Sequence, residues 1–155
     1  MLRLSAALAF LLVATGCDSF SGEEQRLFED TAYRGASDGA TADDWRVSPT
    51  LGSRVQVLQP ASPNPARLRG DDGRGEIVSV QVYADEAPGG FVLYRRTAQG
   101  GLAPVQGLAG APGPNIYTFT FFAGEASATG TAGSVRLVIL DGLERVATYG
   151  DLVLR

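Results

Sequence analysis

Apolar and polar residues alternate along several short stretches in the C-terminal two thirds of the chain. In the clearest stretch, Val78, Val80 and Val82 fall on one side of an extended backbone, and Ser79 and Gln81 fall on the other. A period of two is the mark of a β-strand with one buried face. The pattern therefore predicts a strand whose valines point into a core.

A second alternating stretch, from Ile116 to Phe122, is rich in aromatic residues. Tyr117, Phe119 and Phe121 share one face, and threonines occupy the positions between them. Bulky alternating side chains are typical of a buried face, so we expect these aromatics to belong to the core. The alternative is an exposed strip on which sugar rings stack.

Other short apolar stretches are separated by turns that contain Gly or Pro, such as Ala87-Pro88-Gly89-Gly90 and the hairpin signal Asp141-Gly142. No helical periodicity appears between them. The pattern predicts an all-β, Ig-like antiparallel β-sandwich over residues 45–155, with a small barrel as the alternative. The expected strands cover residues 55–58, 76–84, 91–96, 116–122, 135–140, 145–149 and 152–154.

The beginning of the chain has a different pattern. One cation, Arg3, precedes an apolar run from Leu4 to Ala14 that only Ser5 interrupts. This run is shorter than the roughly 20 residues that a membrane-spanning helix needs, but it suits the apolar part of an export signal. We therefore expect residues 1–16 to be a signal helix that is removed by cleavage.

The tetrapeptide Ala14-Thr15-Gly16-Cys17 follows directly, and it resembles the lipobox of bacterial lipoproteins. The resemblance implies cleavage between Gly16 and Cys17, and attachment of diacylglycerol to the Cys17 sulfur through a thioether. Two or three acyl chains, such as palmitate, hold a protein stably on a membrane. Cys17 is the single cysteine of the chain, so no disulfide can form within it.

Residues 17–44 are expected to form a flexible tether behind this anchor. Glu23 to Tyr33 has room for a helical turn or two, with Leu27 and Phe28 as its apolar residues. The residues that follow, up to position 44, are small and polar, which suits a linker.

The acidic residues near Cys17 bear on which membrane holds the anchor. Asp18 resembles the inner-membrane retention signal of proteobacterial lipoproteins. Asp18, Glu23 and Glu24 together resemble the surface-export signal of Bacteroidetes-like lipoproteins. The expected location is the bacterial cell envelope, with both alternatives open.

A second resemblance covers about residues 60–155. The segment Ser62-Pro63-Asn64-Pro65-Ala66 and the terminal segment 150–155 resemble the opening and closing motifs of the Ig-like C-terminal domains of type IX secretion cargo. The resemblance implies an Ig-like fold and a sorting role. A sorting domain follows a cargo domain, however, and none lies between Cys17 and the expected strands. Alternatively, the two prolines simply restrict the backbone where the first strand ends.

Charge and composition exclude several kinds of chemistry. The chain has 13 basic residues, all arginine, against 17 acidic ones, with no His and a net charge of −4. Without His there is no Ser-His-Asp or Cys-His machinery and no imidazole metal site. Without Lys there is no Schiff base and no P-loop. An acidic chain is also not expected to bind nucleic acid.

Carboxylates are the remaining candidate groups. Asp71, Asp72 and Glu76 lie in one Gly-rich loop, and oxygen ligands of this kind can bind Ca²⁺. We expect instead a solvated acidic turn with no metal, partly neutralised by Arg74. Arg95-Arg96 could attract an anionic group, but adjacent strand residues point to opposite faces and form no common patch.

Taken together, these features predict a membrane-anchored envelope lipoprotein with a structural or protein-interaction role and no cofactor. The expected partners are the membrane, through the N-terminal lipid, and an envelope protein or glycan. One alternative is a carbohydrate- or Ca-binding module. Another is a carboxylate-dependent hydrolase, for which two carboxylates must face each other across a cleft. We do not expect an enzyme.

Overall fold

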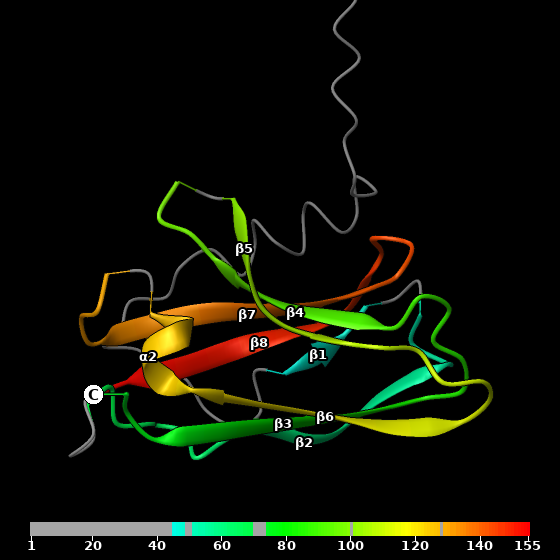
Figure 1. Cartoon of the computed structure of the whole chain (residues 1–155), viewed down its shortest axis with the longest axis horizontal. Coiled ribbons are helices and arrows are strands. Elements are labelled where there is room, and N and C mark those ends of the chain that lie inside the picture. The colour runs from blue at the N-terminus through cyan, green and yellow to red at the C-terminus, as the bar shows by residue number, and fades with distance from the viewer. Residues whose placement is uncertain (1–44, 49–50, 70–73, 100, 128) are drawn as a thin grey trace, which may run out of the picture.

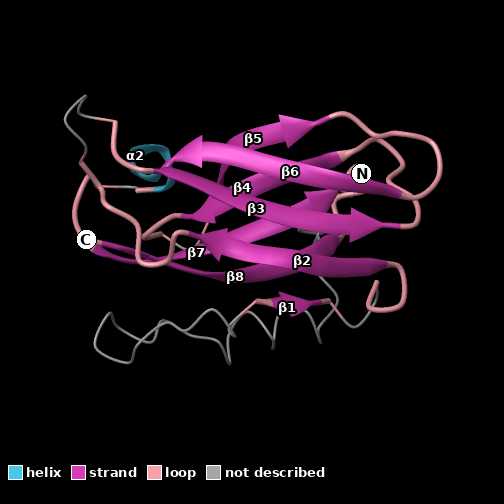
Figure 2. Cartoon of the chain, turned by 90° about the horizontal axis from the view of Figure 1, so that it is seen from below, coloured by secondary structure: helices cyan, strands magenta, loops and turns pink. Residues whose placement is uncertain are grey.

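A computed structural model of the chain describes residues 45–48, 51–69, 74–99, 101–127 and 129–155. They form two antiparallel sheets, packed face to face, and one short helix (Figures 1 and 2). The fold is an all-β sandwich, as the alternating pattern predicted. The expected signal helix and tether lie outside the described residues.

The smaller sheet contains three strands in the order β2-β3-β6. Its members are β2 (Val55–Ser62), β3 (Ile77–Ala84) and β6 (Asn115–Phe122). Val80 of β3 lies opposite Phe119 of β6, and both are fully buried. All three valines and all three aromatics that we assigned to the core are buried, so the prediction for both strands is confirmed.

The larger sheet contains five strands in the order β1-β8-β7-β4-β5. Its members are β1 (Arg46–Val47), β4 (Phe91–Arg96), β5 (Leu102–Leu108), β7 (Gly133–Asp141) and β8 (Val146–Leu154). Leu93, Leu137, Ile139, Leu152 and Leu154 are among its residues in the main core. Apolar side chains from the facing sides of two sheets form a shared interior, which is the main source of stability in such a fold.

The connections between the sheets follow an immunoglobulin-like order. The strands β2, β3 and β6 occupy the positions of strands A, B and E, and β4, β7 and β8 occupy those of C, F and G. Strand β5 adds to the edge of the second sheet beside β4. In this arrangement the β3–β4 and β7–β8 connections emerge at the same end of the sandwich.

Two differences from the expected strands have clear physical reasons. Strand β5 was missed because Pro104 and Gly107 interrupt its pattern, and both residue types are tolerated in an edge strand. The expected separate strands 145–149 and 152–154 are one strand, β8. Gly150 does not end this strand. It leaves room for the ring of Trp45, since a Cβ at this position would lie 2.5 Å from ring atoms.

The short helix α2 (Ala123–Ala126) directly follows β6 and had no counterpart among the expected elements. Two of its residues, Ala123 and Ala126, are buried. Four residues are too few to produce a recognisable helical period, so the sequence carried no signal for it.

Side chains cover the open edge of β6. The backbone N–H of Thr120 donates to Gln106 Oε1 at 2.7 Å, and the N–H of Phe122 donates to Glu125 Oε2 at 3.0 Å. The N–H of Ile116 donates to the side chain of its neighbour Asn115. These bonds satisfy donors that an edge strand otherwise leaves open.

Candidate functional site

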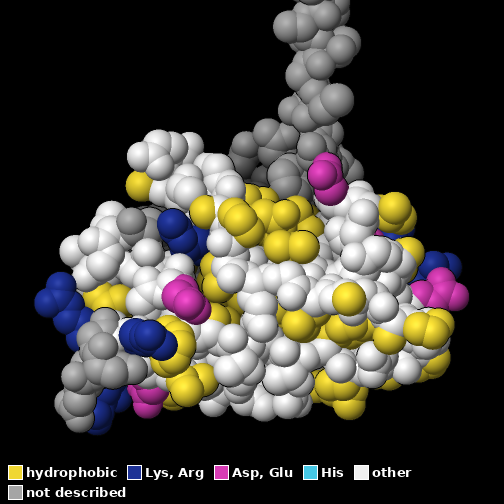
Figure 3. Space-filling view, in the orientation of Figure 1, with side chains coloured by type: hydrophobic (Ala, Val, Ile, Leu, Met, Phe, Trp, Pro, Cys, Tyr) yellow, Lys and Arg dark blue, Asp and Glu magenta, His cyan; other side chains and the backbone are white. Residues whose placement is uncertain are grey.

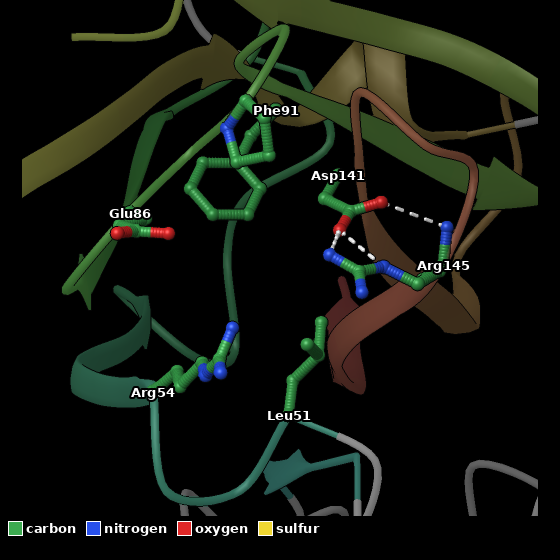
Figure 4. Close-up of a pocket in the computed structure, with 7 residues that line it drawn as sticks. Leu51, Arg54, Glu86, Phe91, Asp141 and Arg145 are labelled. Carbon is green, nitrogen blue, oxygen red and sulfur yellow. Dashed lines mark hydrogen bonds and ion pairs between the residues drawn. The ribbon is translucent and has the colours of Figure 1, made fainter. Parts of the chain in front are cut away.

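Three segments far apart in the sequence meet at one end of the sandwich. They are the turn 51–54 before β2, the β3–β4 loop and the β7–β8 turn. Together they line a hollow of about 40 Å³. Its lining residues are Leu51, Arg54, Glu86, Pro88, Phe91, Asp141 and Arg145, most of which point toward a common space in Figure 4.

Asp141 organises one wall of this hollow. Its Oδ1 accepts hydrogen bonds from the backbone N–H groups of Leu143 at 3.0 Å and Arg145 at 2.9 Å. Its Oδ2 accepts from Arg145 Nε at 2.8 Å. The side chain of Asp141 is only 4% exposed, so these donors replace the water that a buried carboxylate would lose.

The turn that Asp141 holds is a three-residue hairpin connection. The N–H of Glu144 donates to the carbonyl of Asp141, and Glu144 has a φ of 60°. A turn closed by a residue in the left-handed region is common in such hairpins. Gly142 permits the close approach of the β3–β4 loop, because a Cβ there would lie 2.4 Å from the carbonyl oxygen of Pro88. The hairpin signal Asp141-Gly142 is therefore confirmed.

Two arginines, together with two carboxylates, line the hollow. The side chain of Arg145 is 44% exposed while it pairs with Asp141. Arg54 is exposed, and Figure 4 shows its guanidinium extending into the space between Leu51 and Glu86. Within the part of the chain that the structure describes, no hydrogen bond or ion pair engages the Arg54 side chain.

The hollow is small, and its buried carboxylate is already hydrogen-bonded. Both oxygens of Asp141 already accept hydrogen bonds from N–H donors of the turn. A volume of about 40 Å³ is far below the roughly 300–1,000 Å³ of small-molecule sites. It has room for a few water molecules or the tip of one polar side chain.

A tyrosine with an altered acidity lies near the same loop. Tyr83, at the end of β3, donates its hydroxyl to Asp85 Oδ1 at 2.8 Å. This hydrogen bond to the Asp85 carboxylate raises the pKa of Tyr83 above its usual value near 10.0. The bond ties the start of the β3–β4 loop to the outer side of the small sheet.

Of the three candidate Ca²⁺ ligands, Glu76 alone lies among the described residues. Glu76 accepts a hydrogen bond from the backbone N–H of Arg67 at 3.0 Å, and Asp71 and Asp72 lie outside those residues. No group of three or more potential metal ligands is found within the described part of the chain. Arg74 lies over the ring of Phe122, with its Cζ 5.6 Å from the ring centre.

The aromatic face of β6 is interior. Tyr117, Phe119 and Phe121 are all buried, so they cannot form a surface platform for sugars. Tyr117 meets Phe91 edge to face, with ring centres 4.9 Å apart and planes at 78°. Its hydroxyl accepts a hydrogen bond from the N–H of Ala111. The pair joins the two sheets close to the hollow.

The two arginines of β4 point to opposite faces, as predicted. Arg95 lies opposite Leu137, which faces the main core, so Arg96 lies on the outer side. Arg95 Nη1 is buried and has no hydrogen-bond partner among the described residues. The space-filling view in Figure 3 shows acidic and basic side chains interspersed, with no continuous basic surface on the described part of this face.

The two motifs that resemble a sorting domain lie side by side. Beyond β2 the chain crosses to the larger sheet, where Ala66 forms a parallel bridge with Leu154. The N–H of Leu68 donates to the carbonyl of Arg155 at 2.8 Å. The segment around Asn64 therefore packs along the end of β8, and β2 ends at Ser62, directly before Pro63.

The candidate anchoring residues Gly16 and Cys17 lie outside the described residues, as does the rest of the lipobox-like segment. No helix in the described part of the chain is both long enough and apolar enough to cross a bilayer.

Comparisons with known proteins identify no relative of this chain. A scan against protein-family models, a search of curated proteins and a search of solved structures each find no match to this chain.

Sequence reasoning did not identify the hollow as a unit. Both turn signals that form it, at residues 87–90 and 141–142, were recognised as turns. Arg54 gave no signal, because a single arginine in a loop has no periodic or motif context. Only the fold places Arg54 beside Asp141 and Arg145.

Proposed function

We propose that this chain is a lipid-anchored protein of the bacterial cell envelope whose β-sandwich binds an acidic partner protein through its loop end. The lipobox-like segment ending in Cys17, which follows a short apolar run, supports the anchor. The exposed Arg54 side chain at the hollow supports the binding role. No cofactor or catalytic step is part of the proposal.

The observation that carries the binding role is the exposed Arg54 guanidinium beside the Asp141–Arg145 pair. A planar guanidinium donates two parallel hydrogen bonds to a carboxylate, so arginine is well suited to recognising Asp and Glu side chains. The small volume of the hollow matches one such side chain. Its position on loops framed by two sheets resembles the end of a sandwich that variable immunoglobulin domains use for binding.

The alternatives receive less support. A sugar-binding strip would need exposed aromatics, whereas those of β6 are buried. A hydrolase would need two available carboxylates facing a cleft, whereas Asp141 is fully engaged in its turn. A Ca²⁺ module would need Glu76 as a ligand, and this side chain is bonded to the Arg67 backbone.

The anchor is tested by replacing its sulfur. Metabolic labelling with palmitate should label the full chain, and Cys17→Ala should abolish the label and leave unprocessed or soluble protein. Ser21→Ala, which leaves the lipobox-like residues unchanged, should be labelled like wild type. A Cys17→Ala protein that remains in the membrane fraction in mature form would contradict the anchoring proposal.

The binding role is tested by reversing one charge in the hollow. Tagged full-length protein is recovered from detergent-solubilised envelope, and the co-purifying proteins are quantified. Arg54→Glu should reduce recovery of a specific partner about tenfold, which corresponds to ~1.4 kcal/mol. The backbone carbonyl of Arg54 accepts a hydrogen bond from the N–H of Asp85. Replacing the Arg54 side chain does not change this carbonyl, so the turn should persist.

The matched control is Arg69→Glu, since Arg69 is exposed and does not line the hollow. The two variants carry the same net charge, so only a local effect separates them. An acid-to-arginine change in the captured partner should restore binding to Arg54→Glu. If both variants recover every co-purifying protein equally, the hollow is not the binding surface.

A further inference from the structure

A second apolar cluster lies outside the main core, on the outer face of the five-stranded sheet. Its buried members are Val138 and Leu140 of β7 and Val146 and Tyr149 of β8. Their neighbours Leu137 and Ile139 point the other way, into the main core. The partly buried side chains of Tyr94 and Leu102 extend the cluster. We refer to these six residues as the outer cluster.

The outer cluster is more deeply buried than its position in the sheet explains. Val138 is 0% exposed, Tyr149 is 3% exposed and Leu140 is 7% exposed. All six members belong to the five-stranded sheet itself, and neither Figure 1 nor Figure 2 shows a described helix or strand of the other sheet on this side. Neighbours within one sheet pack beside a side chain but do not cover its tip. Apolar side chains gathered on an outer sheet face favour a further layer that covers them.

The sequence of β7 independently indicates two covered faces. Residues 137–140 are Leu-Val-Ile-Leu, an uninterrupted apolar run instead of an alternation. Such runs are typical of strands that are buried on both sides, as in sheets with a layer on each face. By contrast, β3 alternates strictly, and its outer side carries Ser79 and Gln81. The two sheets therefore differ in whether their outer faces are covered.

We propose that residues 18–44 provide this layer, with the segment from Phe20 to Arg34 packed against the outer cluster. The chain enters the described domain through β1, at the edge of this same sheet, where Arg46 pairs with Tyr149 of the cluster. The segment carries four large apolar or aromatic side chains in otherwise polar surroundings: Phe20, Leu27, Phe28 and Tyr33. Covering them and the cluster together removes apolar surface from water on both sides.

Because the segment is joined to β1, it is held closer to the outer cluster than any other chain. A segment joined directly to β1 is confined near the cluster, so its effective concentration there is high without any intermolecular association. A second copy of the protein would instead have to pay the entropy of association. The proposal concerns packing alone, so it stands or falls independently of lipid attachment at Cys17.

Trypsin offers a direct test on the full chain purified in detergent. With no lysine present, trypsin cuts only after arginine, and the Arg34–Gly35 bond lies at the C-terminal end of the segment. Packing should protect this bond, because a protease cleaves only a locally opened chain. The double variant Leu27→Asp with Phe28→Asp should release the segment and speed cleavage at Arg34 at least tenfold. The residues next to the scissile bond are the same in both proteins.

The matched control is Ala40→Asp with Ala42→Asp, which adds the same charge to the polar stretch that follows the segment. It should be cleaved at Arg34 as slowly as wild type. A change on the sheet side, Val138→Thr, keeps the shape but adds a hydroxyl that a covered face disfavours. It should also speed cleavage at Arg34. Thr on the outer face of a strand is otherwise well tolerated, so the domain itself should remain folded.

Two results would overturn the proposal. Cleavage at Arg34 that is equally fast in wild type and in the Leu27/Phe28 variant would show that the segment does not cover the cluster. A molecular mass of two chains by light scattering, together with protection that disappears on dilution, would assign the outer cluster to a second copy of the protein.

Discussion

The side-chain amide of Asn64 pairs with the backbone around Val153 much as a neighbouring strand would. Asn64 Oδ1 accepts from the N–H of Val153 at 2.9 Å, and Asn64 Nδ2 donates to the carbonyl of Asp151 at 3.0 Å. Immediately beyond, the N–H of Ala66 donates to the carbonyl of Val153. One side chain thus continues the covered edge of β8 between two stretches of backbone pairing.

Asn64→Ala should destabilise the fold by about 1–3 kcal/mol, since it leaves two partly buried backbone groups without partners. Asn64→Asp should also be destabilising, because a carboxylate cannot donate to the Asp151 carbonyl. Denaturant unfolding of the full chain measures both. Asn115→Ala, which removes a cap from an exposed N–H, is the control and should cost less. Equal costs at the two sites would show that the Asn64 pairing contributes little.

Phe119→Ala should destabilise the domain by about 3–5 kcal/mol or prevent folding, because Phe119 is fully buried between the sheets. Thr118→Ala, on the exposed face of the same strand, should change the stability little. Thermal unfolding distinguishes them. If the two variants melted together, the interior position of Phe119 would be wrong.

Gly150→Ala should displace the ring of Trp45, since the new Cβ would lie 2.5 Å from it. Overpacking of this kind costs about 1–3 kcal/mol. Trp45 is the single tryptophan of the chain, so its fluorescence should shift to longer wavelength as the ring becomes more exposed. Gly107→Ala, whose Cβ would meet one side-chain atom at 3.9 Å, should leave the emission unchanged. Unchanged emission in both variants would contradict the contact.

Millimolar Ca²⁺ should not raise the melting temperature. A ligand that binds only the folded state stabilises it by mass action, but the Glu76 carboxylate is engaged by the Arg67 N–H. Unfolding in EDTA and in Ca²⁺ should therefore coincide. A rise of several degrees with Ca²⁺ that is lost in Glu76→Gln would establish a site in this loop.

Tyr83 should lose its proton at a higher pH than an ordinary tyrosine, because its hydroxyl donates to the Asp85 carboxylate. A pKa that is higher in the folded than in the unfolded state adds stability below the unfolded value near 10.0. This contribution is lost as the pH rises through the folded pKa. Phenolate absorbance should show the transition at lower pH in Asp85→Asn, with Tyr83→Phe identifying the signal. No change in Asp85→Asn would rule out the hydrogen bond as the cause.

The alternation of apolar and polar residues predicted best those strands that have one buried and one solvent-facing side. In β3 and β6, the requirement that every second side chain be buried leaves a period of two in the sequence. Strand β5 left no such trace, because Pro104 and Gly107 are accepted at an edge. Gly150 suggested a break within β8, and only the three-dimensional position of Trp45 explains why the strand continues.

The candidate site was less accessible to sequence reasoning. Asp141-Gly142 correctly indicated a hairpin, but the ion pair between the buried Asp141 and the partly exposed Arg145 depends on the turn geometry. Arg54 reaches the hollow through contacts between segments about 90 residues apart, which no local pattern encodes. The apolar run in β7 did carry a signal for a second covered face, since it lacks the alternation of β3.

The capped edges of β6 and β8 decide how another polypeptide can join this sandwich. Recognition by strand addition needs a row of free backbone donors and acceptors along an edge. On β6, side chains already bond the N–H groups of Thr120 and Phe122, and on β8 the chain covers its own edge. A partner at these two edges cannot extend the sheet and must be recognised by its side chains. The same capping hinders copies of the domain from pairing through these two edges when they are crowded together.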